Sequence, residues 1–133
     1  MIYLDSNVFI YSLIYEDTLG VVQKAEYYLK QVVTGEIAGC TCTLTWDEVF
    51  YNVLKSTGLN EAIRAGKSLL SFPNLKFLNV DFELIAKAHE LAAERKLKPR
   101  DAIHAASAIE YCNGEIISND AEFDCVDQIR RTF

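Results

Sequence analysis

The sequence predicts a single α/β domain over residues 1–133 with a mainly parallel sheet. Two observations carry this prediction. Short apolar segments, typical of buried strands, alternate with longer segments whose apolar residues recur at helical spacing. In addition, no repeat, low-complexity tract or linker rich in Pro, Gly or Ser divides the 133 residues. That length suits one domain with its own core.

The first half of the chain contains two predicted strands and four predicted helices. The strands are residues 1–4 (MIYL) and 36–44 (EIAGCTCTL), and the helices are residues 5–14, 17–34, 45–56 and 60–72. Polar residues of the kind that cap helices precede the first helix. Apolar side chains from Val21 to Val32 are spaced for one face of the second. Gly58 ends the third helix and Pro73 stops the fourth.

The second half continues the alternation. Strands are predicted at residues 75–80 (LKFLNV), 114–118 (GEIIS) and, at the edge of the sheet, 129–133 (IRRTF). One helix follows Asp81, which caps it, and the next begins at Pro99, because proline suits the first helical position. Gly114 ends that helix, and a further helical turn begins in residues 119–123.

Composition excludes some classes of function. The net charge of −6 argues against a protein that coats nucleic acid by bulk attraction, but not against an enzyme whose metal ions meet a polyanion. No apolar run approaches the ~20 residues that cross a bilayer, and the N-terminus lacks the basic start of a signal peptide. The four cysteines show no CxxC or zinc-finger spacing. We therefore expect a cytoplasmic protein with buried free thiols and no membrane partner.

Acidic side chains recur where predicted strands end and helices begin. Asp5 follows the first strand, and Glu48 lies in the first turn of the helix after the second. Asp101 lies in the first turn of the helix before the fourth strand, Asp120 follows that strand, and Asp124 comes four residues later. Parallel strands end at one rim, where the next helices begin, so four distant acids can meet in one cleft. Spacing alone does not show that they do.

Each acid also has an ordinary structural role. Thr45 and Glu48 match a capping box, in which Glu48 bonds back to the Thr45 amide. Asp5 and Asp120 can cap the helices that follow them, as Asp81 does. The helix dipole favours Asp101 in any first turn.

The repulsion between neighbouring carboxylates supports the alternative interpretation, in which the acids form a metal site. Two carboxylates about 5 Å apart repel by roughly 3 kcal/mol at an effective dielectric constant of about 20. Acids that do meet must therefore protonate, spread apart or bind cations. Hard oxygen ligands select Mg²⁺ or Mn²⁺ over zinc. Such a site suits metal-assisted attack of water on a phosphodiester.

Four segments in order resemble the PIN-domain family of metal-dependent ribonucleases, particularly the VapC-like toxins of prokaryotic toxin–antitoxin pairs. The segments are YLDSNVFIY, TLTWDEVFY, LKPRDAIHAASAI and IISNDAEFD, and together they span nearly the whole chain. The resemblance aligns Asp5, Glu48, Asp101 and Asp120 with the four acids of that family. Ser118 stands where threonine is common, which retains the hydroxyl.

The resemblance implies a fold, a cofactor and partners. The implied fold is a twisted parallel sheet of about five strands flanked by helices, often in a homodimer. One or two Mg²⁺ or Mn²⁺ ions, a single-stranded RNA substrate and an inhibitory antitoxin segment laid into the site are also implied.

The implied site uses Asp5, Asp101 and Asp120 as direct or water-mediated metal ligands. Glu48 completes the ligand set or orients the attacking water, and Asp124 stays open as an alternative fourth acid. Asn7 and Ser118 would orient the carboxylates through hydrogen bonds.

The flanking cations and a histidine have weaker signals. Lys96, Lys98 and Arg100 can steer an RNA backbone toward Asp101, or they simply form a solvated helix end. His104, one turn after Asp101, can assist proton transfer, but a hydrogen-bonded structural histidine is the favoured interpretation.

Two other functions compete. A PIN-fold module that binds RNA or protein without turnover would have little reason to retain mutually repelling acids. A receiver-like phospho-acceptor domain needs paired acids at the first strand and a lysine after the last, whereas this chain has YLDSN and IRRTF there.

Overall fold

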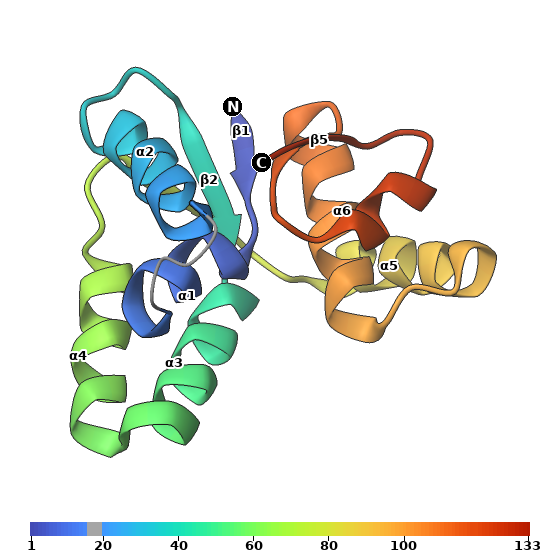
Figure 1. The fold of residues 1–133 in the computed structure, drawn as a ribbon. Helices are drawn as coiled ribbons and strands as arrows, with labels where there is room; N and C mark the ends of the chain where they lie inside the picture. Colours follow the sequence, from blue (N-terminus) through green and yellow to red (C-terminus); the bar gives the residue numbers. More distant parts are fainter. Residues whose placement is uncertain (16–19) are drawn as a thin grey trace.

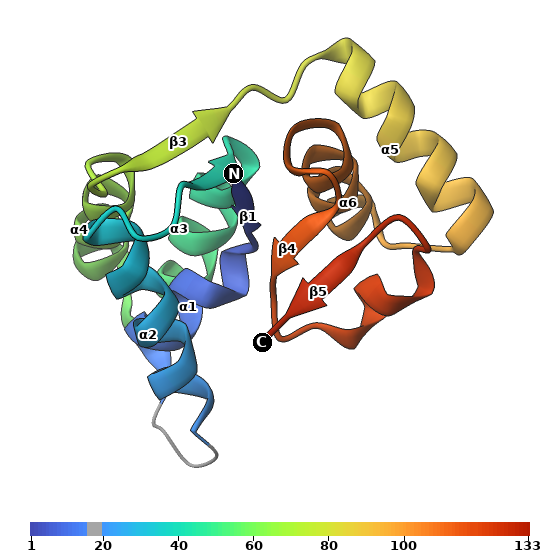
Figure 2. The same ribbon diagram turned by 90° about the horizontal axis from the view of Figure 1, so that it is seen from above.

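The computed structural model describes residues 1–15 and 20–133, which form one five-stranded sheet with helices on both faces (Figures 1 and 2). The strand order is β3-β2-β1-β4-β5, and every neighbouring pair is parallel. The strands are β1 Ile2–Leu4, β2 Gly39–Cys42, β3 Leu75–Leu78, β4 Glu115–Ile117 and β5 Arg130–Thr132. The prediction of an α/β fold with about five mainly parallel strands is confirmed, and the described strands are all parallel.

The helices also follow the predicted order. They are α1 Ser6–Ile14, α2 Val21–Val33, α3 Leu44–Thr57, α4 Leu59–Leu70, α5 Phe82–Arg95, α6 Pro99–Cys112 and the short 3₁₀ helix η1 Ala121–Cys125. The helix predicted over residues 17–34 is observed from Val21, and residues 17–19 lie outside the described part of the chain. The second and third strands are shorter than predicted, because only Gly39–Cys42 and Leu75–Leu78 pair in the sheet.

Alternation along the short strands separates two apolar cores. Leu4 and Ile117 are buried with α1, α2, α3 and α4 on one face of the sheet. Tyr3 and Ile116, the next residues along the same strands, are buried with α5, α6 and η1 on the other. Figure 2 shows these two groups of helices on opposite sides of the strands. Because side chains of a strand alternate between faces, β1 and β4 each supply both cores.

The turn between α6 and β4 depends on a glycine. The last residue of α6 is Cys112, and Asn113 caps the helix in the left-handed conformation, so the helix ends before Gly114 is reached. Gly114 also has a positive φ of 79°, and a Cβ built there would lie 1.8 Å from the Gln128 carbonyl oxygen. Only glycine lets the chain entering β4 pass this close to the backbone that leads into β5.

One sequence expectation changes. Cys40, Cys42 and Cys112 are buried as free thiols, but Cys125, the last residue of η1, is exposed. Within the described residues, no helix is long and apolar enough to cross a membrane.

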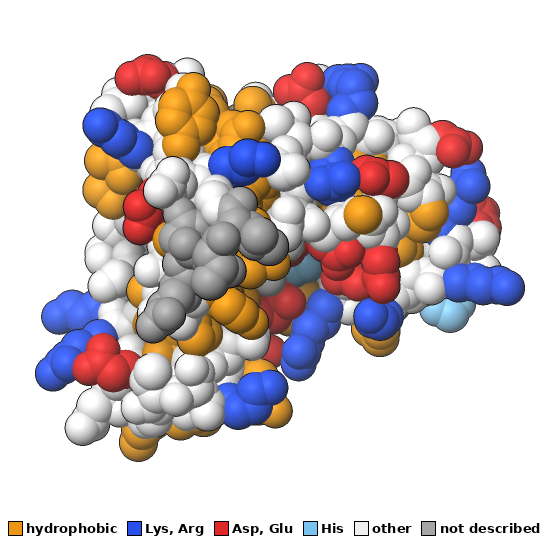
Figure 3. Space-filling view, viewed as in Figure 1, with side chains coloured by type: hydrophobic (Ala, Val, Ile, Leu, Met, Phe, Trp, Pro, Cys, Tyr) orange, Lys and Arg blue, Asp and Glu red, His pale blue; other side chains and the backbone are white. Residues whose placement is uncertain are grey.

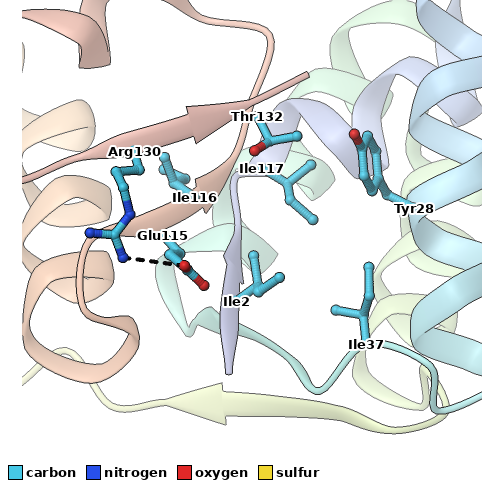
Figure 4. A pocket seen from close by; sticks show the side chains of 8 residues that line it. All are labelled: Ile2, Tyr28, Ile37, Glu115, Ile116, Ile117, Arg130 and Thr132. Carbon is cyan, nitrogen blue, oxygen red and sulfur yellow. Dashed lines mark hydrogen bonds and ion pairs between the residues drawn. The ribbon is translucent and has the colours of Figure 1, made fainter.

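A cavity of about 280 Å³ lies along β4 and β5, where their side chains face α2 (Figure 4). Its lining is mostly apolar, with Ile2, Ile117 and Tyr28 around it and an ion pair of 3.2 Å between Arg130 and Glu115. None of the acids predicted for the site lines this cavity. Asp5 and Asp120 lie instead beyond the carboxyl ends of β1 and β4.

Candidate active site

Asp5 lies at the carboxyl end of β1, where the strand turns into α1. Its Oδ1 accepts a hydrogen bond of 2.7 Å from the Ser6 amide, so Asp5 caps α1 as predicted. Its Oδ2 accepts a 2.7 Å bond from the Ser118 hydroxyl, just beyond β4. Burial raises the pKa of Asp5, an effect that His104 and the Ser118 bond partly offset. The carboxylate is thus held in one orientation, with only 5% of the residue exposed.

Ser118, just beyond β4, connects the end of that strand to the end of the neighbouring β1. Besides donating to Asp5, its hydroxyl accepts bonds of 3.0 Å from the Asn7 side-chain amide and from the Asp120 backbone amide. One buried hydroxyl therefore orients Asp5 and the start of η1 together. Asn7 acts on the carboxylate through Ser118, and its own Oδ1 is buried with no hydrogen-bond partner among the described residues.

Glu48 does not form the predicted capping box. The α3 helix begins at Leu44, and no side chain caps its first amides. The Thr45 hydroxyl instead lies 2.6 Å from the Thr41 hydroxyl of β2, and the Glu48 carboxylate bonds to Nε2 of His104 on α6. The capping interpretation is wrong because each of the two side chains bonds to a different partner, Thr45 to Thr41 of β2 and Glu48 to His104 of α6.

Three further acids converge beside Glu48 and His104. One carboxylate oxygen each from Asp101, Asp120 and Glu122 lies within 4.8 Å of the other two. Asp101 comes from the first turn of α6, Asp120 caps η1 through the Glu122 amide at 2.9 Å, and Glu122 lies within η1. The sequence prediction missed Glu122. Its signal was the run of three acids in NDAEFD, which a tight 3₁₀ turn brings back toward Asp120.

Asp101 carries the electrostatic strain of this arrangement. Its carboxylate accepts no hydrogen bond from the described residues, although it is partly buried. Burial, followed by repulsion from Asp120 and Asp5, raises its pKa to about 6. A divalent cation would remove this repulsion, and an all-carboxylate set is the hard oxygen chemistry that Mg²⁺ and Mn²⁺ select. The residues present therefore fit the metal that the resemblance implies.

Asp124 lies outside this group. Its two oxygens accept bonds of 2.8 and 2.9 Å from the Arg131 guanidinium, and this pairing lowers the pKa of Asp124. The acid that follows β4 and faces Asp101 is Asp120.

Small side chains place α6 against the sheet. Ala102, Ala105, Ala106 and Ala108 are all buried along it. Because alanine adds little bulk, the helix backbone approaches the strands closely, and the longer polar side chains of its first turns reach the strand ends.

Two of the three predicted basic residues form ion pairs, and the partner of Lys98 is one of the three clustered acids. The Lys98 ammonium lies 3.3 Å from Glu122, whose hydrogen bond and charge raise the pKa of Lys98. Arg100 lies 3.6 Å from Asp47, and Lys96 is exposed at the end of α5. Figure 3 shows acidic side chains gathered in the hollow centre of one face, with basic side chains around them.

Comparison with known proteins agrees with this geometry. The family model described as "PIN domain" matches residues 2–129. No curated protein matches the chain. The fold is similar to a toxin–antitoxin complex from Klebsiella pneumoniae, with a TM-score of 0.69, 19% identity, and coverage of 98% of this chain and 96% of that one.

Two further structures are similar, both of complexes bound to DNA. VapBC2 from Rickettsia felis, bound to a promoter fragment, has a TM-score of 0.71 at 19% identity, covering 99% of this chain and 98% of that one. DNA-bound VapBC from Salmonella typhimurium has a TM-score of 0.65 at 20% identity, with the same coverage. At these identities the likeness shows the fold alone. The family match, which extends over almost the whole sequence, places this chain in the PIN domain family.

Proposed function

We propose that this chain is a Mg²⁺- or Mn²⁺-dependent endoribonuclease that hydrolyses phosphodiester bonds of single-stranded RNA. The observation that carries the proposal is the convergence of Asp101, Asp120 and Glu122, with one oxygen each within 4.8 Å, beside the buried Asp5 and the partly buried Glu48. Membership of the PIN domain family supports it. Five acids at one rim are costly to a protein that has no cation to neutralise them.

The chain's own residues divide the work of hydrolysis. Asp101, Asp120 and Glu122 would hold one or two ions, with Asp5 completing the ligand set from its fixed position. The bound ion would lower the pKa of water and neutralise charge on the phosphate oxygens. Glu48 has one oxygen engaged by His104, which leaves the other to orient the attacking water.

Water would form the new bond to phosphorus and give up a proton to solvent, while the bond between phosphorus and the leaving RNA oxygen breaks and that oxygen takes up a proton from solvent. No covalent intermediate with the protein is required, so the site needs no nucleophilic side chain. Catalysis then consists of positioning and charge neutralisation.

The cations at the rim suit a polyanionic strand. Lys98 and Arg100 are 75% and 54% exposed at their side chains, so both can turn from their acidic partners to RNA phosphates. Lys96 extends the same edge. Because the whole chain carries a net charge of −6, this local basic group, rather than bulk charge, would guide the RNA backbone.

The proposal extends to partners. The similar structures include toxin–antitoxin complexes, which supports a cognate antitoxin whose segment covers the acidic site. We infer a toxin role in the cytoplasm and a homodimer as the working assembly. Co-expression with the protein encoded by the adjacent gene, followed by purification on one tag, tests the pairing.

The test of the activity is cleavage of a mixed-sequence single-stranded RNA with Mn²⁺ or Mg²⁺. Cleavage should disappear in EDTA and in Asp101→Asn, while the matched control Asp124→Asn should cleave normally, because Asp124 is paired with Arg131 outside the site. RNA binding without cleavage at saturating metal would instead identify a binding module. Equal cleavage by wild type and Asp101→Asn would refute the proposed site.

A further inference from the structure

His104 is fully buried between three elements, and the proposed chemistry gives it no role. It lies on α6, one turn after Asp101. Its Nδ1 is 2.7 Å from the Tyr3 hydroxyl of β1, and its Nε2 bonds to Glu48 of α3. The same Nε2 is 3.5 Å from Oδ1 of Asp5. The ring therefore connects the sheet to the only one of the five acids that is carried by α3.

The hydrogen-bond directions follow from the available protons. The backbone amide of Cys42 donates to the Tyr3 oxygen at 3.1 Å, so that oxygen is already an acceptor there. In the neutral ring, the one proton of the Tyr3 hydroxyl is then free to point at Nδ1 of His104, which also lies 3.8 Å from Sγ of Cys42. Nε2 must in turn carry the ring proton and donate it to the Glu48 carboxylate. A doubly protonated ring would donate from Nε2 as well, so this bond has the same direction in either charge state.

We propose that His104, oriented by Tyr3, is the positioning residue that holds Glu48 at the acidic site. This inference rests on the proposed nuclease function and deepens it. Glutamate has three rotatable side-chain bonds, and repulsion from nearby Asp5 pushes a free Glu48 outward. The hydrogen bonds that run from the Cys42 amide through Tyr3 and His104 hold the Glu48 carboxylate in place relative to β2. They do so although α3, which carries Glu48, and α6, which carries His104, pack on opposite faces of the sheet.

The arrangement also separates the acids into two groups with different tasks. Asp101, Asp120 and Glu122 form no hydrogen bond or ion pair with the ring among the described residues, and their oxygens lie together where an ion can bind. Glu48 is 13% exposed at its side chain, and the Nε2 atom to which it bonds also lies 3.5 Å from Oδ1 of Asp5. A group fixed by a hydrogen bond in this way is suited to orienting water, a task that depends on geometry more than on charge.

Three variants separate positioning from simple packing. His104→Leu retains an apolar body without a donor, whereas His104→Gln places an amide nitrogen near the position of Nε2 and can donate to Glu48. Tyr3→Phe keeps the buried ring and removes only the hydroxyl. The control Ser107→Ala removes another buried polar group of α6, whose hydroxyl bonds to the Ile103 carbonyl at 2.8 Å and takes no part in the site.

The first readout is steady-state cleavage of RNA at saturating Mn²⁺, with each melting temperature measured alongside. Loss of a partner that orients a metal-site ligand typically costs 10- to 100-fold. We expect His104→Leu to lower kcat by that amount with KM for RNA unchanged, His104→Gln to recover at least half of this loss on a logarithmic scale, and Tyr3→Phe to lie between them. Ser107→Ala should keep the wild-type kcat.

The second readout needs neither metal nor RNA. Long-range ¹H–¹⁵N spectra of the histidines should show a proton on Nε2 of His104, far downfield because it is shared with a carboxylate. Glu48→Gln should move that proton upfield by replacing the charged acceptor with a neutral one, and Asp124→Asn should leave it in place.

The possible results distinguish failure of the positioning role of His104 from failure of the proposed nuclease function. Wild-type protein that neither binds Mn²⁺ nor cleaves RNA refutes the proposed function. A different result refutes only the positioning role: the wild type cleaves normally, folded Tyr3→Phe and His104→Gln keep the wild-type kcat, and the chemical shift of the Nε2 proton does not change in Glu48→Gln. If His104→Leu does not fold, Tyr3→Phe and the spectra still decide between the two roles.

Discussion

Replacing Asp101 with asparagine should stabilise the metal-free protein above pH 6 while abolishing cleavage. Burial and the neighbouring Asp120 and Asp5 raise the pKa of Asp101 from 3.8 to about 6 in the folded protein. The folded state therefore binds the Asp101 proton more tightly than the unfolded chain does. The stabilisation from this proton is complete below pH 4 and is lost as the pH rises through about 6.

The size of the effect follows from the same shift. A tenfold change in proton affinity corresponds to 1.36 kcal/mol, so a rise in pKa from 3.8 to about 6 sets an upper limit of about 3 kcal/mol. Partial exposure of Asp101 to solvent and the favourable dipole of α6 reduce this to about 1–2 kcal/mol. Asparagine has the same shape and no charge, so Asp101→Asn avoids this cost. For a chain of this length, the melting temperature should rise by about 3–8 °C at pH 7.5.

The assay is thermal melting of wild type and Asp101→Asn in EDTA at pH 5 and pH 7.5. The gap in melting temperature should be largest at pH 7.5 and should shrink at pH 5, where the wild-type carboxyl is mostly protonated. Asp124→Asn should give no stabilisation, because its carboxylate is paired with Arg131. A variant no more stable than wild type at pH 7.5, or a gap that does not change with pH, would refute the electrostatic reasoning.

Other measurements probe the rest of the site. Mn²⁺ should raise the melting temperature of wild type more at pH 7.5 than at pH 5, since protons compete for Asp101 below about pH 6; an equal rise at both values, or one retained in Asp101→Asn, would argue against binding there. Ser118→Ala removes a hydroxyl that makes three hydrogen bonds and leaves Oδ2 of Asp5 without its donor. It should lower the free energy of unfolding in urea by about 1–3 kcal/mol and reduce kcat, and an unchanged midpoint would contradict this. The double variant in which glutamine replaces both Lys98 and Arg100 should bind RNA more weakly at low salt. The slope of log affinity against log salt concentration should become shallower by about 0.7 for each phosphate contact that is lost. An unchanged slope would show that the RNA does not contact these two residues.

Local features of the fold were predictable because each depends on residues that are adjacent in sequence. Asp5 caps α1 and Asp81 caps α5 through amides one and three residues away, and Pro99 begins α6. The alternation of strands and helices led to the parallel sheet, since parallel neighbours need a crossover between them. Once the sheet is parallel, its carboxyl rim and the acids along it follow.

Long-range pairing decided the rest. The order of residues was enough to predict acids at one rim of a parallel sheet, because strand ends and helix starts are local events. Packing between the layers is what turns Glu48 to His104, 56 residues away, instead of to its own helix. It likewise brought Glu122 beside Asp101 and paired Asp124 with Arg131. Each of these choices depends on which side-chain orientation finds a partner across the fold, and sequence spacing carries no information about that partner until the layers have packed.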